Sequence, residues 1–416
     1  MLDINFIREN PEEVKKGIAK KQLTVDIDRL LSLDKTKRDI LQKIEALRAE
    51  QNNANKEIIK LKNDVKKQKL AEMKKIADQV KDVNNKLGII EKDFTDLMRQ
   101  IPNLPAPNVK VGRGEQDNQV ARHEGDIPKF EFDPKDYVEI AEELDIIDTK
   151  RAAKVAGSRF GYIKGDLVLL EFALIRFAFD ILTKAGFRLV LPPVMLNDNA
   201  MRGMGYLDRG AEEVYKTQDD LYLIGTSEQS LGAMHMDEIL DSKKLPLHYA
   251  GFSTCFRREA GSYGKDTKGI LRVHQFNKVE MFVFCKPEQS EDEHKLLLRM
   301  EENLMQALKL PYRVMDICSG DLGDPAAKKW DIEAWFPGSS EYRETHSTSN
   351  CTDWQARRLN IRYKDENNKN QFVHTLNGTA FSERPLLAIL ENYQTEAGGV
   401  RVPDVLREYV GKEMIE

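Results

Sequence analysis

The chain has 416 residues, which is long enough for two domains and at least one sizeable hydrophobic core. Its formal net charge of -5 excludes a uniformly basic nucleic-acid-binding surface, and no window of about 18 apolar residues predicts a membrane span. The start of the chain lacks the pattern of a secretory signal and the four cysteines lack paired spacing, so we expect a cytoplasmic protein with reduced thiols and no zinc site.

The first third of the chain predicts two long helices. Residues 29–101 contain no proline and one glycine, Gly88, and apolar residues recur there every seven positions in two stretches. The two series are Leu33, Ile40, Leu47, Ala54 and Leu61, and then Met73, Val80, Leu87, Phe94 and Ile101. Two such series joined by a polar turn predict an antiparallel coiled-coil hairpin that reaches roughly 45–50 Å.

The predicted turn of this hairpin, residues 60–75, is rich in lysine and includes Lys66, Lys67 and Lys69. The charge would keep an exposed tip in solution, or it would form a patch that binds phosphates on an otherwise acidic protein. Composition alone leaves both interpretations open.

The remainder of the chain predicts an α+β domain. Three prolines in residues 101–112 indicate a semi-rigid linker, and we expect a domain at 1–105, a linker at 106–130 and a second domain at 131–416. Strands and helices follow without regular crossovers, which favours an antiparallel sheet flanked by helices. The clearest expected elements are strands at 188–191, 221–224, 279–285 and 372–376 and helices at 167–185 and 291–310.

The stretch "FRREAGSYGKDTKGILRVHQFNKVEMFVF", residues 256–284, predicts a hairpin with charged ends. Side chains alternate along a strand, so Arg257 and Glu259 share one face of the first strand. On the second strand one face carries Arg272, His274, Phe276, Lys278 and Glu280, and the other carries Val273, Val279, Met281 and Val283. A guanidinium, an aromatic ring and a carboxylate are suited to a nucleotide, but a solvated face with salt bridges fits the pattern equally well.

Five segments, in order, resemble the class II aminoacyl-tRNA synthetases, in the form found in seryl-tRNA synthetases. The hairpin resembles motif 2, "GFRLVLPPVM" (186–195) resembles the motif 1 strand, and "GTSEQ" (225–229) resembles the serine-binding loop. "YRETHSTSNCTDWQARRLNIRY" (342–363) resembles the segment before motif 3, and "LNGTAFSERPLLAILENYQ" (376–394) resembles motif 3. The helical hairpin resembles the tRNA-binding arm of this family.

The resemblance implies a class II catalytic domain that forms seryl-adenylate from L-serine and ATP and then charges the 3′ end of tRNA(Ser), and of tRNA(Sec) where present. It also implies Mg²⁺ with the ATP, a homodimer, and an arm that reads a long variable arm of the tRNA through Lys66, Lys67 and Lys69. By position, Arg257 and Arg384 are the catalytic residues, and Glu344 and Ser347 are the Mg²⁺ ligands. The serine pocket would contain Thr226, Ser227, Glu228, Arg257, Glu280, Asn377 and Thr379. The ATP site would contain Arg257, Arg258, Glu259, Val273, Phe276, Glu344, Thr345, His346, Ser347 and Arg384.

The sequence departs from the family pattern in two places. Lys265 and Lys268 stand in the motif 2 loop where arginines are expected, and a lysine makes no bidentate phosphate contact. In motif 3, "SERP" replaces a run of small residues, and Arg384 lies one residue closer to Asn377 than in the common pattern. Two other readings remain: a relative that loads a carrier protein, which should lack the arm, and an inactive RNA-binding paralogue, which should lack Arg257 or Arg384.

Overall fold

The computed structural model describes residues 1–59, 61–260 and 268–416. The chain divides into two compact units. One, here the N-terminal unit, comprises Leu2–Ala19 and Leu23–Pro102, and the other, the C-terminal unit, comprises Met1, Lys20–Gln22 and Asn103–Glu416. No helix in the part of the chain that the structure describes is long and apolar enough to span a bilayer.

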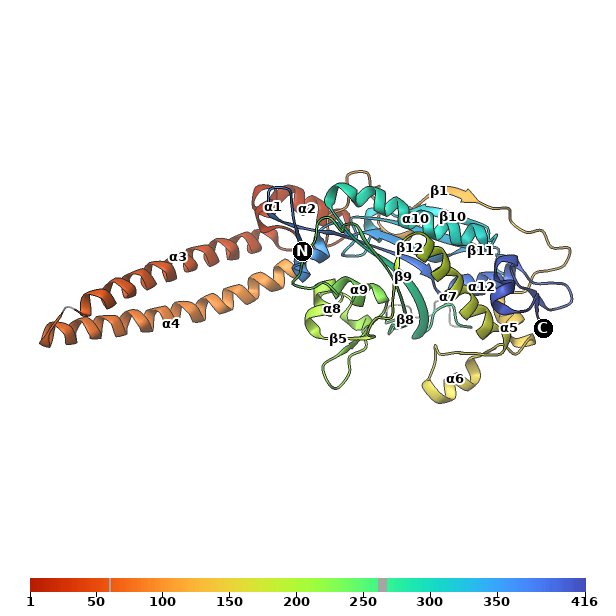
Figure 1. Cartoon of the computed structure of the whole chain (residues 1–416), viewed down its shortest axis with the longest axis horizontal. Helices are drawn as coiled ribbons and strands as arrows, with labels where there is room; N and C mark the ends of the chain where they lie inside the picture. Colours follow the sequence, from red (N-terminus) through yellow and green to blue (C-terminus); the bar gives the residue numbers. More distant parts are fainter. Residues whose placement is uncertain (60, 261–267) are drawn as a thin grey trace. The chain divides into compact units, whose positions relative to one another are not determined.

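The N-terminal unit is dominated by two long helices that lie alongside each other (Figure 1). Its elements are α1 (Ile4–Glu9), α2 (Pro11–Lys20), α3 (Ile27–Ile58) and α4 (Asn63–Arg99). The heptad pattern faces the partner helix, because Ala54 of the first series is buried, as are Ile44 and Val83 of the interleaved positions, while most of their neighbours are exposed. Lys37 of α3 lies 3.3 Å from Glu91 of α4, near the base of both helices, so the pair is antiparallel. The predicted coiled-coil hairpin is confirmed.

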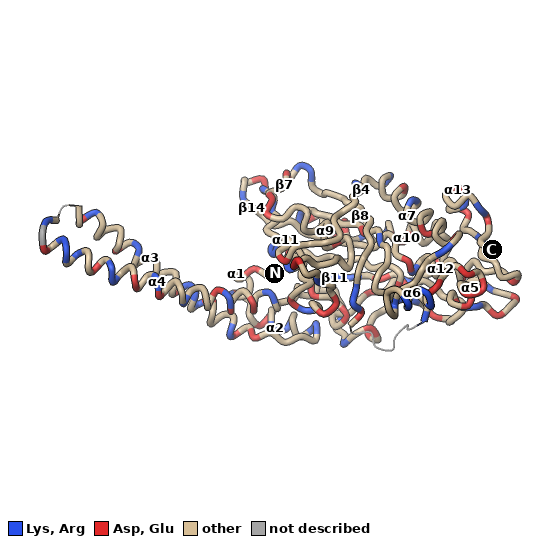
Figure 2. The backbone as a smooth tube through the Cα atoms, turned by 90° about the horizontal axis from the view of Figure 1, so that it is seen from below, with Lys and Arg blue, Asp and Glu red and all other residues tan. Residues whose placement is uncertain are grey.

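The expected turn at 60–75 is shorter than predicted. Helix α4 begins at Asn63, so Lys66, Lys67 and Lys69 lie in its first turns, among the basic residues near the outer end of the hairpin (Figure 2). Lysine, glutamine, leucine and alanine, which fill this stretch, all favour helix. The Lys69 ammonium lies 3.5 Å from carboxylate oxygens of both Glu57 on α3 and Glu72 on α4, so it also ties the two helices together.

The C-terminal unit is built on an eight-stranded sheet with strand order β1-β10-β11-β12-β15-β9-β8-β4. Adjacent strands are antiparallel except β4 and β8, which are parallel at one edge. In that order the strands are Gln119–Glu124, Tyr312–Asp316, Lys328–Phe336, Glu341–Asn350, His374–Phe381, Gln275–Cys285, Leu247–Phe256 and Arg188–Val190. The α+β class with a large antiparallel sheet is therefore confirmed.

Helices and small sheets surround this sheet (Figure 1). The helices are α5 (Tyr137–Glu143), α6 (Thr149–Ala156), α7 (Asp166–Lys184), α8 (Asp198–Met204), α9 (Ser227–Ala233), α10 (Ser290–Ala307), α11 (Trp354–Leu359), α12 (Glu383–Asn392) and α13 (Arg407–Val410). The short strands are β2 (Ile147–Asp148), β3 (Tyr162–Ile163), β5 (Met195–Leu196), β6 (Tyr222–Leu223), β7 (Ile239–Leu240), β13 (Arg362–Lys364), β14 (Asn370–Phe372), β16 (Val400–Arg401) and β17 (Met414–Ile415). The strand expected at 372–376 is interrupted, because β14 pairs with β13 while β15 joins the large sheet.

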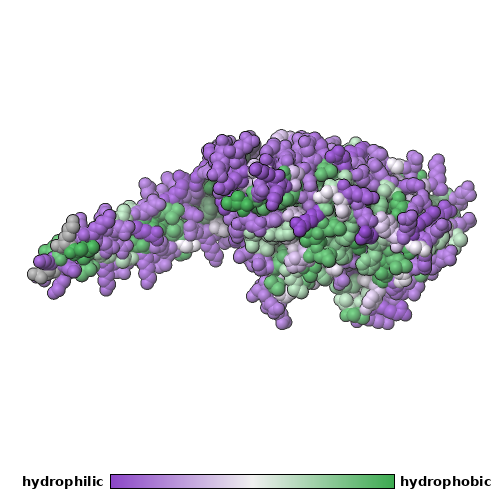
Figure 3. All heavy atoms as spheres, viewed as in Figure 1, coloured by the Kyte–Doolittle hydropathy of each residue, from purple (hydrophilic) through white to green (hydrophobic). Residues whose placement is uncertain are grey.

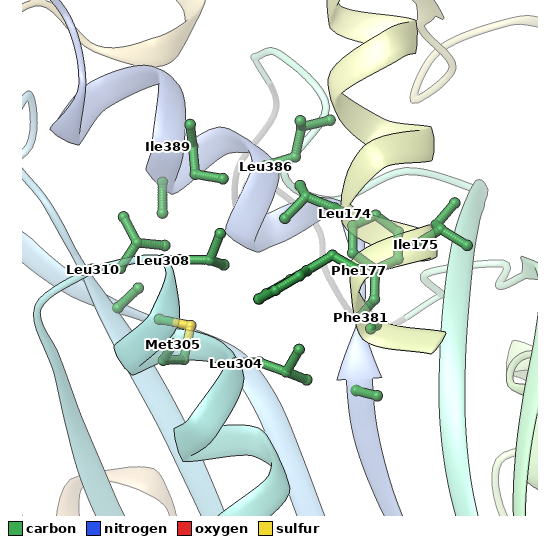
Figure 4. Close-up of a cluster of buried hydrophobic side chains, with 14 of the residues drawn as sticks. Leu174, Ile175, Phe177, Leu304, Met305, Leu308, Leu310, Phe381, Leu386 and Ile389 are labelled. Atoms are coloured by element: carbon green, nitrogen blue, oxygen red, sulfur yellow. The ribbon is translucent and has the colours of Figure 1, made fainter. Parts of the chain in front are cut away.

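The two faces of the large sheet have different roles. Helices α7, α10 and α12 cover one face, where Phe177, Met305 and Leu386 converge in the main core (Figure 4). Residues Val279, Met281 and Val283 of β9 point into this core, whereas the alternating residues Phe282 and Phe284 join a second cluster with Leu231 of α9 and Ala356 of α11. The predicted core face of β9 is confirmed, and on the opposite face only the part around Lys278 and Glu280 carries polar side chains.

Candidate active site

A cavity of about 700 Å³ lies over the face of the sheet opposite α7, α10 and α12. It is lined from β9 by Phe276, Lys278 and Glu280, and from β12 and β15 by further polar side chains. The residues of the expected serine and ATP sites that line it are Thr226, Glu228, Arg257, Glu259, Val273, Phe276, Glu280, Glu344, Thr345, Ser347, Asn377, Thr379 and Arg384. Residues up to 158 positions apart in the sequence thus meet in one cavity.

Three residues of the expected site do not line this cavity. The Ser227 hydroxyl is buried and donates a hydrogen bond to the carbonyl of Gly251 (2.9 Å). The side chain of Arg258 lines a neighbouring hollow, together with His274, which was expected on the same strand face as Phe276. His346 is buried next to the Thr345 hydroxyl (2.9 Å), and burial lowers its pKa to about 3, so the ring is neutral.

The hairpin ends differ from the expected extended strands. Strand β8 ends at Phe256, so Arg257 and Glu259 follow the strand instead of sharing one of its faces, and Glu259 has φ 52°. The backbone N–H of Arg257 still donates to the carbonyl of His274 (3.0 Å), and its side chain donates to the carbonyl of Gly225 (3.1 Å). Both side chains therefore reach the cavity. Lys265 lies outside the described residues.

Arginine side chains lie against an aromatic ring and a carboxylate at this end of the cavity. The guanidinium carbon of Arg257 is 5.0 Å from the centre of the Phe276 ring, within the range of a cation–π contact. The carboxylate of Glu259 accepts a hydrogen bond from Arg272 (3.0 Å). This arrangement presents positive charge next to an aromatic surface, as a nucleotide requires.

A buried glutamate anchors another part of the cavity. One carboxylate oxygen of Glu228 accepts a hydrogen bond from the Tyr206 hydroxyl (2.9 Å), and the other accepts one from the Gln355 side chain (3.0 Å). Thr226 caps helix α9, and its hydroxyl accepts from the backbone N–H of Glu228 (3.2 Å). Burial, together with the adjacent Glu228, raises the pKa of Tyr206 well above its ordinary value, so its hydroxyl remains a donor.

A buried ion pair lies on β9 beside this glutamate. Lys278 and Glu280 are two residues apart on the same strand face, and their charged groups are in direct contact. Burial raises the pKa of Glu280, while Lys278 favours the ionised form. Asn377 and Thr379, from the adjacent strand β15, complete a small polar pocket around this pair.

Residues of β12 and the start of α12 bring further opposite charges together at the cavity wall. Arg384 donates hydrogen bonds to the backbone carbonyl (2.9 Å) and a carboxylate oxygen (3.0 Å) of Glu344. Partial loss of water opposes ionisation of Glu344, whose side chain is 47% exposed, but Arg384 and Lys329 outweigh this effect and lower the pKa of the carboxyl to about 2. Burial raises the pKa of the neighbouring Asp331 to about 6, although Lys329 lies 2.9 Å away.

Within residues 1–59, 61–260 and 268–416, no group of three or more His, Cys, Asp and Glu side chains is arranged to hold a metal ion.

One wall of the cavity is fixed by residues that the sequence did not suggest. The loop containing Gly323, Pro325 and Ala326 lines the cavity, and the buried Lys21 ammonium donates to the carbonyls of Gly323 (2.8 Å) and Ala326 (2.7 Å). Asn103 donates to the carbonyl of Pro325 (2.9 Å). Burial lowers the pKa of Lys21 to about 7. These partners lie more than 200 residues apart in the sequence, so no local pattern could identify them.

The four cysteines, Cys255, Cys285, Cys318 and Cys351, are free thiols and all are buried. Cys351 lines the cavity, and burial raises the pKa of its thiol well above the ordinary value, so it is not a reactive thiolate.

Comparison with known proteins agrees with this arrangement along the whole chain. Residues 1–105 match the seryl-tRNA synthetase N-terminal domain, and residues 213–393 match the class II tRNA synthetase core domain (G, H, P, S and T). The serine–tRNA ligase of Dictyoglomus turgidum is 44% identical over 99% of this chain and 98% of its own, and that of Corynebacterium efficiens is 45% identical over 100% and 99%. The structure of seryl-tRNA synthetase from Pyrococcus horikoshii complexed with ATP matches with a TM-score of 0.92 and 44% identity, covering 100% of this chain and 99% of that one. The chain therefore belongs to the seryl-tRNA synthetase family of class II aminoacyl-tRNA synthetases.

Proposed function

We propose that this chain is a serine–tRNA ligase, which activates L-serine with ATP and transfers the seryl group to the 3′ end of tRNA(Ser). The observation that carries the proposal is the single cavity that holds Arg257 and Arg384 together with the buried carboxyls of Glu228 and Glu280. Solved relatives of this chain are complexes with ATP and with AMP, which supports a nucleotide in this cavity. Transfer to tRNA(Sec), where that tRNA is present, is part of the same proposal.

In the first step, an oxygen of the serine carboxylate attacks the α-phosphorus of ATP. The bond from the α-phosphorus to the bridging oxygen breaks, and pyrophosphate leaves. Negative charge grows on the α-phosphate oxygens in the transition state, where a positioned guanidinium is most effective. We assign this role to Arg257, whose side chain is already oriented by its hydrogen bond to Gly225. In the second step, the tRNA 3′-hydroxyl displaces AMP from the seryl carbonyl.

The nucleotide would lie along the motif 2 hairpin. Phe276 offers an aromatic face to the base, Glu259 an acceptor for its exocyclic amine, and the backbone at Val273 a contact to its edge. Arg384 would cover the opposite face of the base and the γ-phosphate. In the structure Arg384 is paired with Glu344, so its guanidinium is held at the cavity wall by the same carboxylate that we assign to the metal.

Glu344 and Ser347 would hold Mg²⁺ together with the phosphates of ATP. They fit this ion because Mg²⁺ prefers oxygen ligands and is commonly held by one or two carboxylates plus substrate phosphates. The low pKa of Glu344 keeps its carboxyl ionised, and the side chain is 47% exposed at the cavity. When bound, the ion neutralises phosphate charge. We expect no role for zinc.

Discrimination of serine would rest on the polar pocket around Glu228 and Glu280. Serine is small, so its hydroxyl must be recognised by hydrogen bonds instead of by volume. Alanine and glycine would leave buried polar groups unpaired, which carries a large penalty, whereas threonine would be excluded by size. Tyr206 and Gln355 support this pocket, because they fix both oxygens of Glu228.

We further propose a homodimer formed through α7 and β4. Strand β4 is an edge of the large sheet, and Leu189 and Leu191 at its end are exposed, the latter by 79%. Leu169 and Phe172 of α7 are also exposed, and apolar side chains gather on the face of the C-terminal unit drawn in Figure 3. Exposed apolar surface next to an open sheet edge favours a two-fold interface.

The helical hairpin would bind the tRNA. We propose that it recognises the long variable arm of tRNA(Ser) by shape and backbone contacts, with phosphates meeting Lys66, Lys67 and Lys69. Because its proposed substrate is tRNA, we propose the cytoplasm as the site of action.

ATP–pyrophosphate exchange tests the first step. With Mg²⁺, serine should support rapid exchange, while threonine, alanine and glycine should be poorer by at least about 10²-fold in kcat/KM, because their discrimination uses buried polar groups. Exchange that is equally fast with alanine would refute the assignment of the Glu228 pocket. Exchange with another amino acid and none with serine would refute the proposed substrate.

A further inference from the structure

Glu383 is a buried acid beside Arg384 that the proposed reaction does not use. It is the first residue of α12, it lines the cavity, and it is 9% exposed. Burying a carboxyl is costly unless hydrogen bonds compensate for the lost water. Its hydrogen-bond partner therefore indicates what the residue does.

The partner of Glu383 is the backbone of β9. Its Oε1 accepts a hydrogen bond from the N–H of Asn277 at 3.1 Å. The ladder between β9 and β15 ends at the pair of Val279 and Phe381, because β15 then leaves the sheet and leads into α12. Asn277 lies two residues beyond that last pair; it still faces Thr254 of β8, but β15 no longer offers its N–H a partner. The carboxyl of Glu383 takes the place of the missing strand.

The Asn277 side chain is held from two other elements. Its Oδ1 accepts from the Thr254 hydroxyl on β8 (2.9 Å), and its Nδ2 donates to Oε1 of Glu171 on α7 (2.8 Å). Asn277 also separates Phe276 and Lys278, which both line the cavity. The short segment that presents these two side chains is thus fixed by β8, by α7 and, through Glu383, by α12.

We propose that Glu383 is a positioning residue for the nucleotide: its carboxyl joins the first turn of α12 to β9 and so sets the spacing between Arg384 and Phe276. The inference rests on the proposed function, in which these two side chains contact the base of ATP from opposite faces. A shift of α12 against β9 would alter the width of the base-binding slot, while Tyr206 and Gln355 would still hold Glu228 in the serine pocket.

The protonation of Glu383 indicates which substitution preserves this role. Burial, and then the nearby Glu171, raise the pKa of Glu383 to about 8, so the carboxyl is mostly protonated at neutral pH. A protonated glutamic acid and a glutamine have nearly the same shape, and both offer one carbonyl oxygen to the N–H of Asn277. Aspartate keeps the carboxyl but is one methylene too short to reach.

The test compares Glu383→Gln, Glu383→Ala and Glu383→Asp with wild type in serine-dependent ATP–pyrophosphate exchange. Loss of the acceptor that Glu383 gives to this partly buried N–H should raise KM for ATP about tenfold in the alanine and aspartate variants, with KM for serine within about twofold. Glu383→Gln should restore KM for ATP to within about threefold of wild type. The matched control is Glu171→Gln, which alters a buried carboxyl at the same asparagine but not the backbone contact, and it should leave KM for ATP within about twofold.

Three results would overturn the inference: an unchanged KM for ATP in Glu383→Ala or Glu383→Asp, a glutamine variant as impaired as these, or a parallel rise of KM for both substrates. If thermal unfolding shows that the alanine variant does not fold, the inference is tested by KM for ATP in the aspartate and glutamine variants alone. Wild-type protein without serine-dependent exchange would instead refute the proposed function. If the wild-type protein is active and the Glu383 variants keep its KM for ATP, only the role of Glu383 is refuted.

Discussion

Arg257 illustrates how a single side chain is prepared before any substrate binds. Its backbone continues the hairpin to His274, its Nε donates to the carbonyl of Gly225, and its guanidinium lies over Phe276. A donor held in this way loses little further freedom when charge develops next to it. The sequence also identified this residue, because Arg257 and Glu259 lie in the stretch that resembles motif 2.

Replacing Arg257 by alanine should lower the rate of serine-dependent exchange by about 10²–10³-fold, the usual cost of removing a transition-state donor. The measurement is kcat for ATP–pyrophosphate exchange at saturating substrates. Arg299→Ala, at an exposed position of α10, is the matched control and should behave as wild type. An Arg257→Ala variant with exchange near wild type would show that the α-phosphate does not lie at this residue.

Two buried histidines predict how stability depends on pH. Burial lowers the pKa of His294 to about 4 and that of His346 to about 3, against about 6.5 in an unfolded chain. Between these values only the unfolded state takes up the protons, so the stability that the neutral rings contribute is present above pH 6.5 and is lost as the pH falls. For His294 alone the loss between pH 7.5 and pH 5 should be about 2 kcal/mol.

Urea unfolding at the two pH values measures this loss. His294→Gln should be less stable than wild type at pH 7.5, since the ring stacks on Trp330 and bonds to the carbonyl of Thr348, but it should lose less on acidification. His123→Gln, at an exposed position on β1, should keep the wild-type pH dependence. Equal pH dependence in all three proteins would mean that His294 titrates normally when folded.

At the scale of elements, the sequence was most informative where structure follows a local period. The seven-residue repeat predicted α3 and α4 because helix pairing buries every third and fourth residue, whichever side chains lie elsewhere. The motifs similarly predicted most of the cavity lining. Contacts between distant segments could not be predicted: Tyr206 and Gln355 meet at Glu228, and Lys21 meets the loop at 323–326, only because the fold brings them together. The alternation of polar and apolar residues also does not indicate that β8 ends at Phe256.

Removing the helical hairpin should separate the activation of serine from its transfer to tRNA. Deleting roughly residues 35–97 should leave serine-dependent exchange largely intact, because the cavity lies wholly within the C-terminal unit. Charging of tRNA should collapse, since the proposed tRNA contacts are removed. Charging by the shortened protein at the wild-type rate would show that the hairpin is not needed for tRNA binding.

The lysines at the start of α4 allow a milder version of this test. Because Lys69 also pairs with Glu57, its loss would weaken the helix pair, so Lys66→Gln with Lys67→Gln is the cleaner combination. Neutralising two phosphate contacts should weaken tRNA binding. It should also reduce the slope of log Kd against log salt concentration by up to about two. If the slope, measured at several salt concentrations, is the same as in wild type, the lysines do not bind phosphates and only keep the end of the hairpin in solution.

At the scale of the whole molecule, the exposed apolar residues of α7 and β4 predict that the functional particle is a dimer. Phe172→Asp combined with Leu191→Asp should shift the protein from dimer to monomer at micromolar concentration in sedimentation equilibrium, because each charge would be buried in the interface. Val155→Asp, at an exposed apolar position on α6, is the control and should leave the dimer intact. Wild type that sediments as an active monomer would contradict the proposed assembly.

Charging total tRNA with each of the twenty amino acids, in the presence of ATP and Mg²⁺, shows whether this chain joins serine to tRNA. Serine alone should be attached, attachment should consume ATP and release AMP and pyrophosphate, and the charged species should be tRNAs with a long variable arm. Attachment of a different amino acid, or serine-dependent activation that never yields charged tRNA, would contradict the proposed function.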